Sequence, residues 1–545
     1  MTQQHSRDWV GEIADRVVAE ADRRAPGRPV VCASGISPSG PVHLGNLREL
    51  LVPHFVADEI RRRGVPCTHL LSWDDYDRLR KVPAGFADSY QDHIGRPLSG
   101  VPDPCDRHAS WAEHFKEPFR TALAELGVEV VERSQTQEYA SGTYRQSVLR
   151  AMRDRDRIDA VLARYRTLQT ASGEGEPAHG VYSPYRPYCA HCGRDTTTVV
   201  DYDDATTVLA YTCSYGHAGS YELSGTTSGK LVWKVDWPMR WAHEGVTFEA
   251  GGVDHSSPGS SFAVGAELVR DVFGAEPPVY VGYSFVGTTG AAKMSGSAGL
   301  APTPADALAV LEAPVLRWLY ARRKPSQSIT VNFGQDLLRV YDEWDVLGRR
   351  VAAGTEPAGA VATWNRSRAT AATVLPSTPR PLPFRTLASV VDLVGGDEEQ
   401  MTRVFRELTR DDPMTDLGAL RPRLDKAATW LERYVLADER TTVLSAPNVA
   451  RLATLTPQER EAIELLRAGL DDHWSPDGLT TLVYGVPKRQ QGLPEDAAPT
   501  AELKSAQRAF FALLYELLVG RGTGPRLPTL LLSVGRERIG ELLKV

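Results

Sequence analysis

Apolar residues in the first 75 positions form two short runs with a periodic segment between them. Residues 28–35 are an apolar, β-branched run that ends in small residues, and residues 67–73 are a second apolar run. The apolar positions between the runs are Leu47, Leu50, Leu51, Phe55 and Ile60. Their spacing is close to 3.6 residues, which predicts a helix between two strands. Strand, small-residue turn, helix and strand in this order favour a parallel α/β sheet.

The pattern extends through the first 300 residues and then changes. Periodicity predicts helices over residues 111–126 and 146–168. Apolar runs at residues 230–236 and 278–286 predict strands that return to the sheet. From Pro302 onward the apolar period is helical, so the chain is predicted to combine an α/β half with an α-helical half.

Two apolar stripes support the α-helical half. The stripes are Leu424, Ala428, Leu431 and Val435, and Leu503, Phe510, Leu514 and Leu517. Gly520 stands where a helix C-cap is expected after the second stripe. The proline-rich residues 377–383 predict a hinge between subdomains.

Composition narrows the class of protein. A chain of 545 residues is long enough for three or four domains. With 62 Lys and Arg against 69 Asp and Glu, the net charge of −7 excludes a surface that is basic throughout. No apolar run is long enough to span a membrane, and residues 1–25 lack an apolar signal core. We therefore expect a cytoplasmic globular protein without a membrane partner.

Three of the six cysteines lie close together with a histidine. Cys189 and Cys192 form one close pair, and Cys213 and His217 form a second pair 20 residues later. Two such pairs can complete a tetrahedral Cys3His sphere, which predicts a closed structural zinc site. Two unrelated thiol pairs are the alternative, and His191 is a further possible ligand. Cys32, Cys67 and Cys105 are expected to be plain interior thiols.

Two segments rich in glycine and other small residues indicate nucleotide binding. Residues 38–46 start a helix directly after a strand, where helix N–H groups and the positive dipole end favour phosphate. Gly40 and Gly45 allow a close backbone approach, and His43 adds a donor. The loop at residues 292–297 brings the cation Lys293 after a returning strand, where it can meet charge on a transferring phosphate.

This pair of motifs resembles the HIGH and KMSKS signatures of class I aminoacyl-tRNA synthetases. HLGN at 43–46 corresponds to the first signature and KMSGS at 293–297 to the second. The wider set of motifs resembles the class I lysyl-tRNA synthetase family. These motifs are SGISPSG at 34–40, WDDYDRLRKVP at 73–83, the Cys/His cluster, WKVDWPMRW at 233–241, GVDH at 252–255 and GTGPRLPTLL at 522–531. They cover essentially the whole chain.

The resemblance implies roles for individual residues. Those implied for ATP binding are Pro38, Gly40, His43, Gly45, Asn46, Lys293, Met294, Ser295 and Ser297, with His43, Asn46 and Lys293 as catalytic residues. Those implied for the lysine pocket are Gly35, Ser37, Trp233, His255 and Tyr283, with Asp74 or Asp75 supplying negative charge for the ε-ammonium. Core packing is the alternative for Trp233 and Trp237 and the expected role of Trp241. Loop capping is the alternative for the two aspartates.

The resemblance also implies an architecture. We expect a Rossmann-type parallel-sheet catalytic domain with a zinc-binding insertion, followed by an all-α anticodon-binding half. The predicted segments are 1–180 and 225–300 for the two halves of the catalytic domain, 181–224 for the zinc insert, 301–376 for a helical stem-contact region, and 377–545 for the anticodon-binding domain.

The implied activity is that of a lysine–tRNA ligase. ATP with Mg2+ would activate L-lysine to lysyl-adenylate, and tRNA(Lys) would accept lysine on its 3′-terminal ribose; a monomer is expected. Residues 61–63 and 322–324 are basic candidates for phosphate contacts, and solvated helix faces explain them equally well. Val253 stands where the family pattern has a lysine, and Gly296 replaces the second lysine of KMSKS, as is common in this family. A paralogue that adenylates an amino acid for another acceptor, and a non-catalytic RNA-binding protein, are the alternatives.

Replacement of Lys293 by alanine is the first test. With Gly296 in place of a second lysine, Lys293 is the cation that the loop can bring to the triphosphate. Removal of one such donor costs roughly 10²–10³ in rate. In ATP–pyrophosphate exchange, Lys293→Ala should lower kcat far more than it raises KM for lysine. A near-normal kcat would show that this loop does not clamp the triphosphate.

Overall fold

The computed structural model describes residues 8–166, 182–225, 228–256, 260–288, 301–410 and 416–544. Contacts divide the chain into two units. Unit 1 comprises Met1–Leu308, Ala313–Asn332 and Leu347–Pro376. Unit 2 comprises Ala309–Glu312, Phe333–Val346 and Ser377–Val545. The predicted loop that carries Lys293, Met294, Ser295, Gly296 and Ser297 lies outside the described residues.

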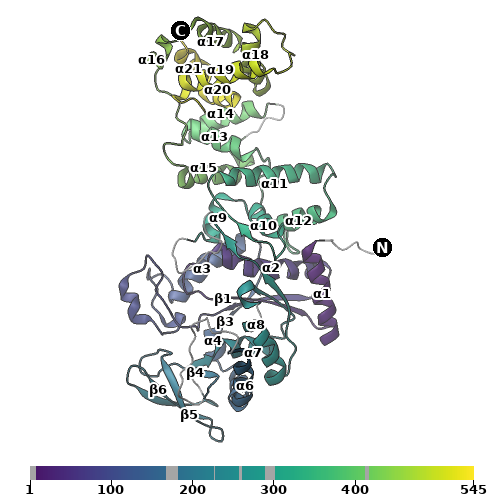
Figure 1. Ribbon diagram of the computed structural model, residues 1–545, viewed down its shortest axis with the longest axis vertical. Coiled ribbons are helices and arrows are strands. Elements are labelled where there is room, and N and C mark those ends of the chain that lie inside the picture. Colours follow the sequence, from purple (N-terminus) through teal and green to yellow (C-terminus); the bar gives the residue numbers. More distant parts are fainter. Residues whose placement is uncertain are drawn as a thin grey trace. The chain divides into compact units, whose positions relative to one another are not determined.

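A five-stranded parallel sheet is the centre of unit 1 (Figure 1). Its strands, in spatial order, are β10 (Val279–Tyr283), β9 (Phe248–Gly252), β1 (Val30–Ile36), β2 (Cys67–Trp73) and β3 (Val131–Ser134). All four strand pairs are parallel, so the predicted α/β fold class is confirmed. Strand order reverses between β1 and β9, and such a switch point is where sheets of this kind form ligand sites.

Helix α2 (Leu44–Arg62) follows β1 and packs against β1, β2 and β9. Its predicted apolar positions, from Leu47 to Ile60, are all fully buried. The other helices and short helical turns of unit 1 are α1 (Trp9–Arg24), η1 (Asp88–His93), η2 (Leu98–Gly100), α3 (Trp111–Glu125), α4 (Gln135–Ala140), α5 (Arg145–Arg153), α6 (Arg155–Arg166), α7 (Trp233–Glu244), η3 (Val253–His255), α8 (Ser261–Leu268), η4 (Val269–Phe273), α10 (Ala313–Ala321) and α12 (Ala358–Arg368). Helices α9 (Pro304–Val310) and α11 (Asp336–Ala352) run across the boundaries of the two units.

The predicted strand over residues 230–236 is wrong. Only β8 (Gly229–Leu231) is extended, and it pairs antiparallel with β4 (Tyr185–Pro187) outside the main sheet. Helix α7 begins at Trp233. The reason is the four-residue spacing of Trp233, Trp237 and Trp241, which places the three rings on one helix face. The prediction for residues 278–286 is confirmed by β10, while β11 (Val286–Gly287) pairs with β12 (Ile329–Thr330).

The insert between α6 and α7 contains a separate antiparallel sheet, drawn at the lower left of Figure 1. Its strands are β5 (Thr197–Asp203), β6 (Val208–Cys213) and β7 (Ala218–Glu222). Leu209 and Tyr211 of β6 join a buried cluster with Val235 and Met239 of α7 and Val264 of α8. The insert therefore shares its apolar core with the helix that carries the tryptophans.

Outside α9 and α11, the secondary structure in the described residues of unit 2 consists of helices. The helices are α13 (Phe384–Val394), α14 (Glu398–Leu408), η6 (Leu417–Leu420), α15 (Arg423–Tyr434), α16 (Val449–Ala453), α17 (Pro457–Gly469), α18 (Pro476–Gln490), α19 (Ala501–Val519), α20 (Leu527–Val534) and α21 (Arg536–Leu542). The stripe on α19 is buried, and Gly520 caps it with a φ of 71°, as predicted. On α15, Leu424 and Leu431 are buried but Ala428 is exposed. Within the described residues, every helix is too short or too polar to cross a lipid bilayer.

Candidate active site and metal clusters

The turn between β1 and α2 is closed by its own side chains. His43 is the N-cap of α2, and its Nδ1 accepts a hydrogen bond from the Gly45 amide at 3.0 Å. Asn46 completes a capping box, because its Oδ1 accepts from the His43 amide at 3.1 Å. In a neutral ring, an accepting Nδ1 puts the proton on Nε2, which is then a donor. The helix start therefore combines a fixed imidazole with the positive end of the α2 dipole.

A cavity lies where β1 and β9 end, at the switch point of the sheet. It is lined by Ala33, Ser34, Gly35, Glu49, Leu70, Ser72, Arg133, Gln135, Tyr144, Trp233, Trp237, Arg240, Trp241, Glu244, Val246, Glu249, Ala250, Gly251 and His255. Three of the predicted lysine-pocket residues, Gly35, Trp233 and His255, are in this lining. Ser37 is exposed and is not in the lining.

Glu49 is one of the lining residues that the sequence prediction missed. It belongs to α2, and its Oε2 accepts a hydrogen bond from the Tyr283 hydroxyl at 3.3 Å. Tyr283 is not in the lining, and this hydrogen bond connects it to the cavity. Burial, with Glu249 and Asp74 nearby, raises the pKa of Glu49 to about 8. The only sequence signal was an acidic residue among the buried positions of a predicted helix.

Three tryptophans of α7 form an aromatic wall along the cavity. The rings of Trp233 and Trp237 are stacked, with centroids 5.2 Å apart and planes 15° apart. Trp241 is 2% exposed and packs against Phe262, which fits the predicted core role, although it also lines the cavity. Because a lysine side chain is a four-carbon stem with a charged end, an aromatic wall beside a carboxylate suits it.

Asp74 and Asp75 are already engaged with other groups. Asp74 Oδ1 accepts from Arg240 at 2.6 Å. Asp75 accepts from Lys116 Nζ at 2.7 Å and from the Thr136 amide at 2.8 Å. Neither aspartate is in the cavity lining. The geometry of Asp75 is that of loop capping, which was the alternative interpretation.

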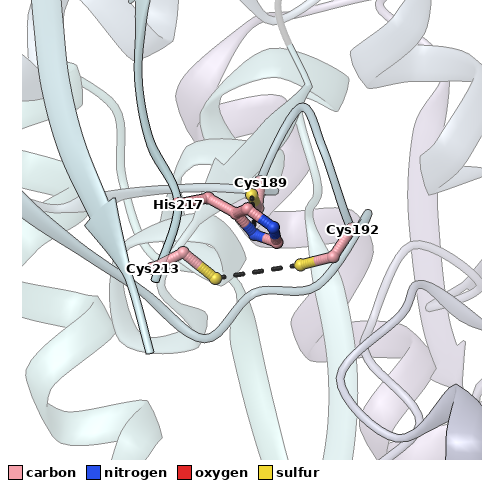
Figure 2. Close-up of side chains that lie close together, drawn as sticks. All are labelled: Cys189, Cys192, Cys213 and His217. Atoms are coloured by element: carbon pink, nitrogen blue, oxygen red, sulfur yellow. Dashed lines mark hydrogen bonds between the residues drawn. The ribbon is translucent and has the colours of Figure 1, made fainter. Parts of the chain in front are cut away.

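The predicted metal ligands come together in the insert (Figure 2). Ligand atoms of Cys189, Cys192, Cys213 and His217 all lie within 4.8 Å of one another. Sγ of Cys192 is 3.8 Å from Sγ of Cys213, and Sγ of Cys189 is 3.6 Å from Nδ1 of His217. Two thiolates bound tetrahedrally at about 2.3 Å from one zinc ion are about 3.8 Å apart. The cluster can therefore hold a metal ion. His191 stacks on His217 instead of joining the cluster.

A second cluster was missed, and it corrects the prediction for Cys105. Ligand atoms of Asp103, Cys105, His108 and His114 also lie within 4.8 Å of one another. Sγ of Cys105 is 3.4 Å from Nδ1 of both histidines. The loop places Asp106 at a φ of 57°, a conformation that costs a non-glycine residue free energy. The sequence signal was weak, because a lone cysteine here lacks the paired spacing of the first cluster. Cys32 is buried, as predicted, whereas Cys67 is half-buried.

Comparison with known proteins identifies the family. The family described as tRNA synthetases class I (K) matches residues 7–369. A lysine–tRNA ligase of Streptomyces coelicolor is 53% identical, with 98% of each chain covered. The enzyme of the same description from Pyrococcus horikoshii is 34% identical, covering 98% of this chain and 99% of its own. The chain belongs to the class I lysyl-tRNA synthetase family. As a member of this synthetase family it is an aminoacyl-tRNA ligase.

In this member of the class I lysyl-tRNA synthetase family, the pair of Asp75 and Lys116 supports the loop after β2. Both side chains are buried, and removal of the Asp75 charge leaves Lys116 with only Glu113, whose Oε1 lies 2.7 Å from its Nζ, as a carboxylate partner. Asp75→Asn should lower the free energy of unfolding by about 3 kcal/mol. The measurement is the shift of the urea midpoint, followed by circular dichroism.

The matched control is Glu276→Gln, which breaks the ion pair with Arg270 at 3.1 Å between two exposed side chains. That change should cost less than about 1 kcal/mol. Equal shifts for the two variants would show that the Asp75 pair does not stabilise this loop.

Proposed function

We propose that the chain is a lysine–tRNA ligase. It activates L-lysine with ATP and Mg2+ to lysyl-adenylate and transfers the lysyl group to the 3′-terminal ribose of tRNA(Lys). The observation that carries this proposal is Glu49, a carboxylate in the cavity lining whose oxygen also meets the Tyr283 hydroxyl. Family membership and the similarity to lysine–tRNA ligases support it over the whole chain.

Glu49 takes the place that the sequence prediction gave to Asp74 or Asp75. Its carboxylate receives the lysine ε-ammonium, while the aliphatic stem lies along Trp233 and Trp237. An amino acid with a shorter side chain leaves Glu49 unpaired in a buried site, and such a loss discriminates strongly. Gly35 faces this carboxylate, since a Cβ built there would lie 4.0 Å from Glu49 Oε1.

The phosphates of ATP bind at the start of α2, where His43, Gly45 and Asn46 are placed. A lysine carboxylate oxygen attacks the α-phosphorus, and the bond to pyrophosphate breaks. In the second step a tRNA ribose hydroxyl attacks the lysyl carbonyl, and AMP leaves. Positioning and charge stabilisation by the α2 N-terminus, His43 and Lys293 lower both barriers. Asn46 holds the backbone of His43.

Residues 377–545, which belong to unit 2, are assigned the anticodon-binding role. The further assignments stay proposals: a monomeric, cytoplasmic enzyme with 301–376 against the tRNA stem, 181–224 as the zinc insert, and 1–180 with 225–300 as the catalytic domain.

We propose that both Cys/His clusters hold zinc. Thiolate and imidazole ligands at the observed separations fit one tetrahedral ion in each cluster. In both sites four ligands come from protein, so each ion is structural. The first ion stabilises the insert, and the second fixes the loop before α3.

The direct test of the function is lysine-dependent ATP–pyrophosphate exchange with and without tRNA, followed by aminoacylation of tRNA(Lys). Exchange together with lysyl-tRNA formation supports the ligase. Exchange without transfer to tRNA indicates the paralogue with another acceptor. Binding of tRNA without exchange indicates the non-catalytic RNA-binding protein. Equal exchange with arginine or ornithine would show that the pocket is not built for lysine.

Glu49→Gln tests the pocket. Loss of a charge-assisted hydrogen bond in a buried site should lower kcat/KM for lysine by roughly 10²-fold or more. KM for ATP should stay within about twofold. The control is Glu117→Gln, whose side chain is 59% exposed on α3. An unchanged kcat/KM in Glu49→Gln would remove Glu49 from the pocket.

The pH dependence of lysine use follows from the same residue. Burial raises the pKa of Glu49 to about 8, so below pH 8 the free pocket carries a proton that must leave before an ammonium binds. We expect kcat/KM for lysine to rise by up to about tenfold per pH unit from 6 to 8 and then to level. In Glu49→Gln the slope should fall. A profile that is flat from pH 6 to 8 in the unmodified enzyme contradicts this assignment.

Metal content tests both clusters. Purified protein should contain two zinc ions per chain, measured by plasma emission spectrometry. Cys213→Ser and Cys105→Ser should each reduce the content to one ion, and Cys213→Ser should lower the unfolding temperature because the insert loses its ion. Cys32→Ser is the matched control and should keep both ions. One ion in the unmodified protein, retained in Cys105→Ser, would leave only the first site.

A further inference from the structure

A second carboxylate, that of Glu249, contacts the aromatic wall of α7. Glu249 is in β9, between Ala33 of β1 and Tyr280 of β10, and it is 6% exposed. Its Oε1 accepts from Trp237 Nε1 at 3.0 Å, and its Oε2 accepts from Trp241 Nε1 at 2.5 Å. One carboxylate therefore fixes two indole rings.

The two indoles reach the cavity in different ways. Trp237 stacks on Trp233, and its ring edge meets His255 with centroids 6.0 Å apart. Trp241 is held from behind by Gly265 of α8, because a Cβ there would lie 3.0 Å from the Trp241 ring. Trp241 therefore has little room to move, whereas the tilt of Trp237 depends on its stacking and on the hydrogen bond to Glu249.

The ionised state of Glu249 is costly, which argues for a purpose beyond packing. Burial raises the pKa of Glu249 to about 7, although the two indole N–H groups oppose that rise. The other charged groups that face it are Arg240, Asp74 and Glu49, and Arg240 is already bonded to Asp74 and Asp236. An apolar residue at this point of β9 would pack at a lower cost. A carboxylate instead sets the orientation of two rings, which apolar contact alone leaves less defined.

We propose that Glu249 is a positioning residue of the lysine pocket, acting through Trp237 on the wall that Trp233 and Trp237 present to the substrate. The inference rests on the proposed function and adds a residue to its specificity. Glu49 binds the charged end of lysine, and Glu249 orients the aromatic surface along which the aliphatic stem lies.

A double-mutant cycle tests this role in the full-length chain, by ATP–pyrophosphate exchange in the presence of tRNA. Glu249→Gln keeps one acceptor oxygen but turns an amide N–H toward one indole. It should raise KM for lysine roughly tenfold, with kcat and KM for ATP within about twofold. Trp237→Phe removes the donor and should raise KM for lysine similarly. If Glu249 acts through Trp237, the double variant should exceed the larger single effect by no more than about twofold.

Several results would overturn the inference. One such result is a KM for lysine in Glu249→Gln that stays within twofold of the KM of the unmodified enzyme. A roughly hundredfold additive rise in the double variant is another, since it shows independent action. A lower kcat together with a higher KM for ATP in Glu249→Gln would indicate general damage to the fold and would also overturn the positioning role. Glu117→Gln serves as the exposed Glu-to-Gln control.

The outcomes separate this inference from the proposed function. No lysine-dependent exchange by the unmodified enzyme overturns both. An active enzyme with an unaffected Glu249→Gln overturns only the positioning role. If Glu249→Gln is insoluble, Trp237→Phe and Trp241→Phe decide, because each removes one donor from Glu249. A raised KM for lysine in Trp237→Phe then supports the inference, and an unchanged KM in both variants overturns it.

Discussion

The pocket depends on the hydrogen bonds that the buried Arg240 guanidinium donates to two carboxylates. It bonds Asp74 at the end of β2 and Asp236 one turn earlier in α7. Lys230 of β8 joins the network, with its Nζ 3.3 Å from Asp236 and 2.5 Å from Asp77. Loss of Arg240 would leave two buried carboxylates with reduced compensation, which is costly. The network ties α7, and hence its tryptophans, to the main sheet on one side and to the insert on the other.

In the proposed mechanism, helix α2 has two roles that need different residues on adjacent turns. Its first turn, closed by His43 and Asn46, presents the positive end of the helix dipole to the nucleotide side. Glu49, one turn further on, faces the cavity on the amino-acid side. Because one helix carries both groups, the distance between Glu49 and the proposed phosphate site is fixed by helix geometry rather than by loops.

In the proposed mechanism, Val253 and Gly296 reduce the number of positive charges that can contact the phosphates of ATP. Val253 is 41% exposed in the turn after β9, where the family pattern has a lysine. With a second lysine also replaced by Gly296, positive charge for the phosphates comes from Lys293 and from the start of α2. This concentrates transition-state stabilisation on fewer groups, so each of them carries a larger part of the rate.

The sequence by itself determined the parallel sheet, the α2 helix and the first Cys/His cluster. Each of these depends on local spacing, such as the 3.6-residue period from Leu47 to Ile60 or the paired ligands ending at His217. It also showed the resemblance to the family, because long motifs such as residues 233–241 are contiguous in the chain.

Only the tertiary structure decided which charged side chains line the cavity and which are paired with other residues. Asp74 and Asp75 follow a strand as pocket residues would, but Arg240 and Lys116 pair with them across more than 40 residues. Glu49 and Glu249 reach one cavity from a helix and a strand 200 residues apart, and no spacing rule connects them. The second Cys/His cluster likewise depends on a strained loop that folds Cys105 back onto His114. Pairing of buried charges is a property of three-dimensional neighbours, and the linear order of residues does not contain it.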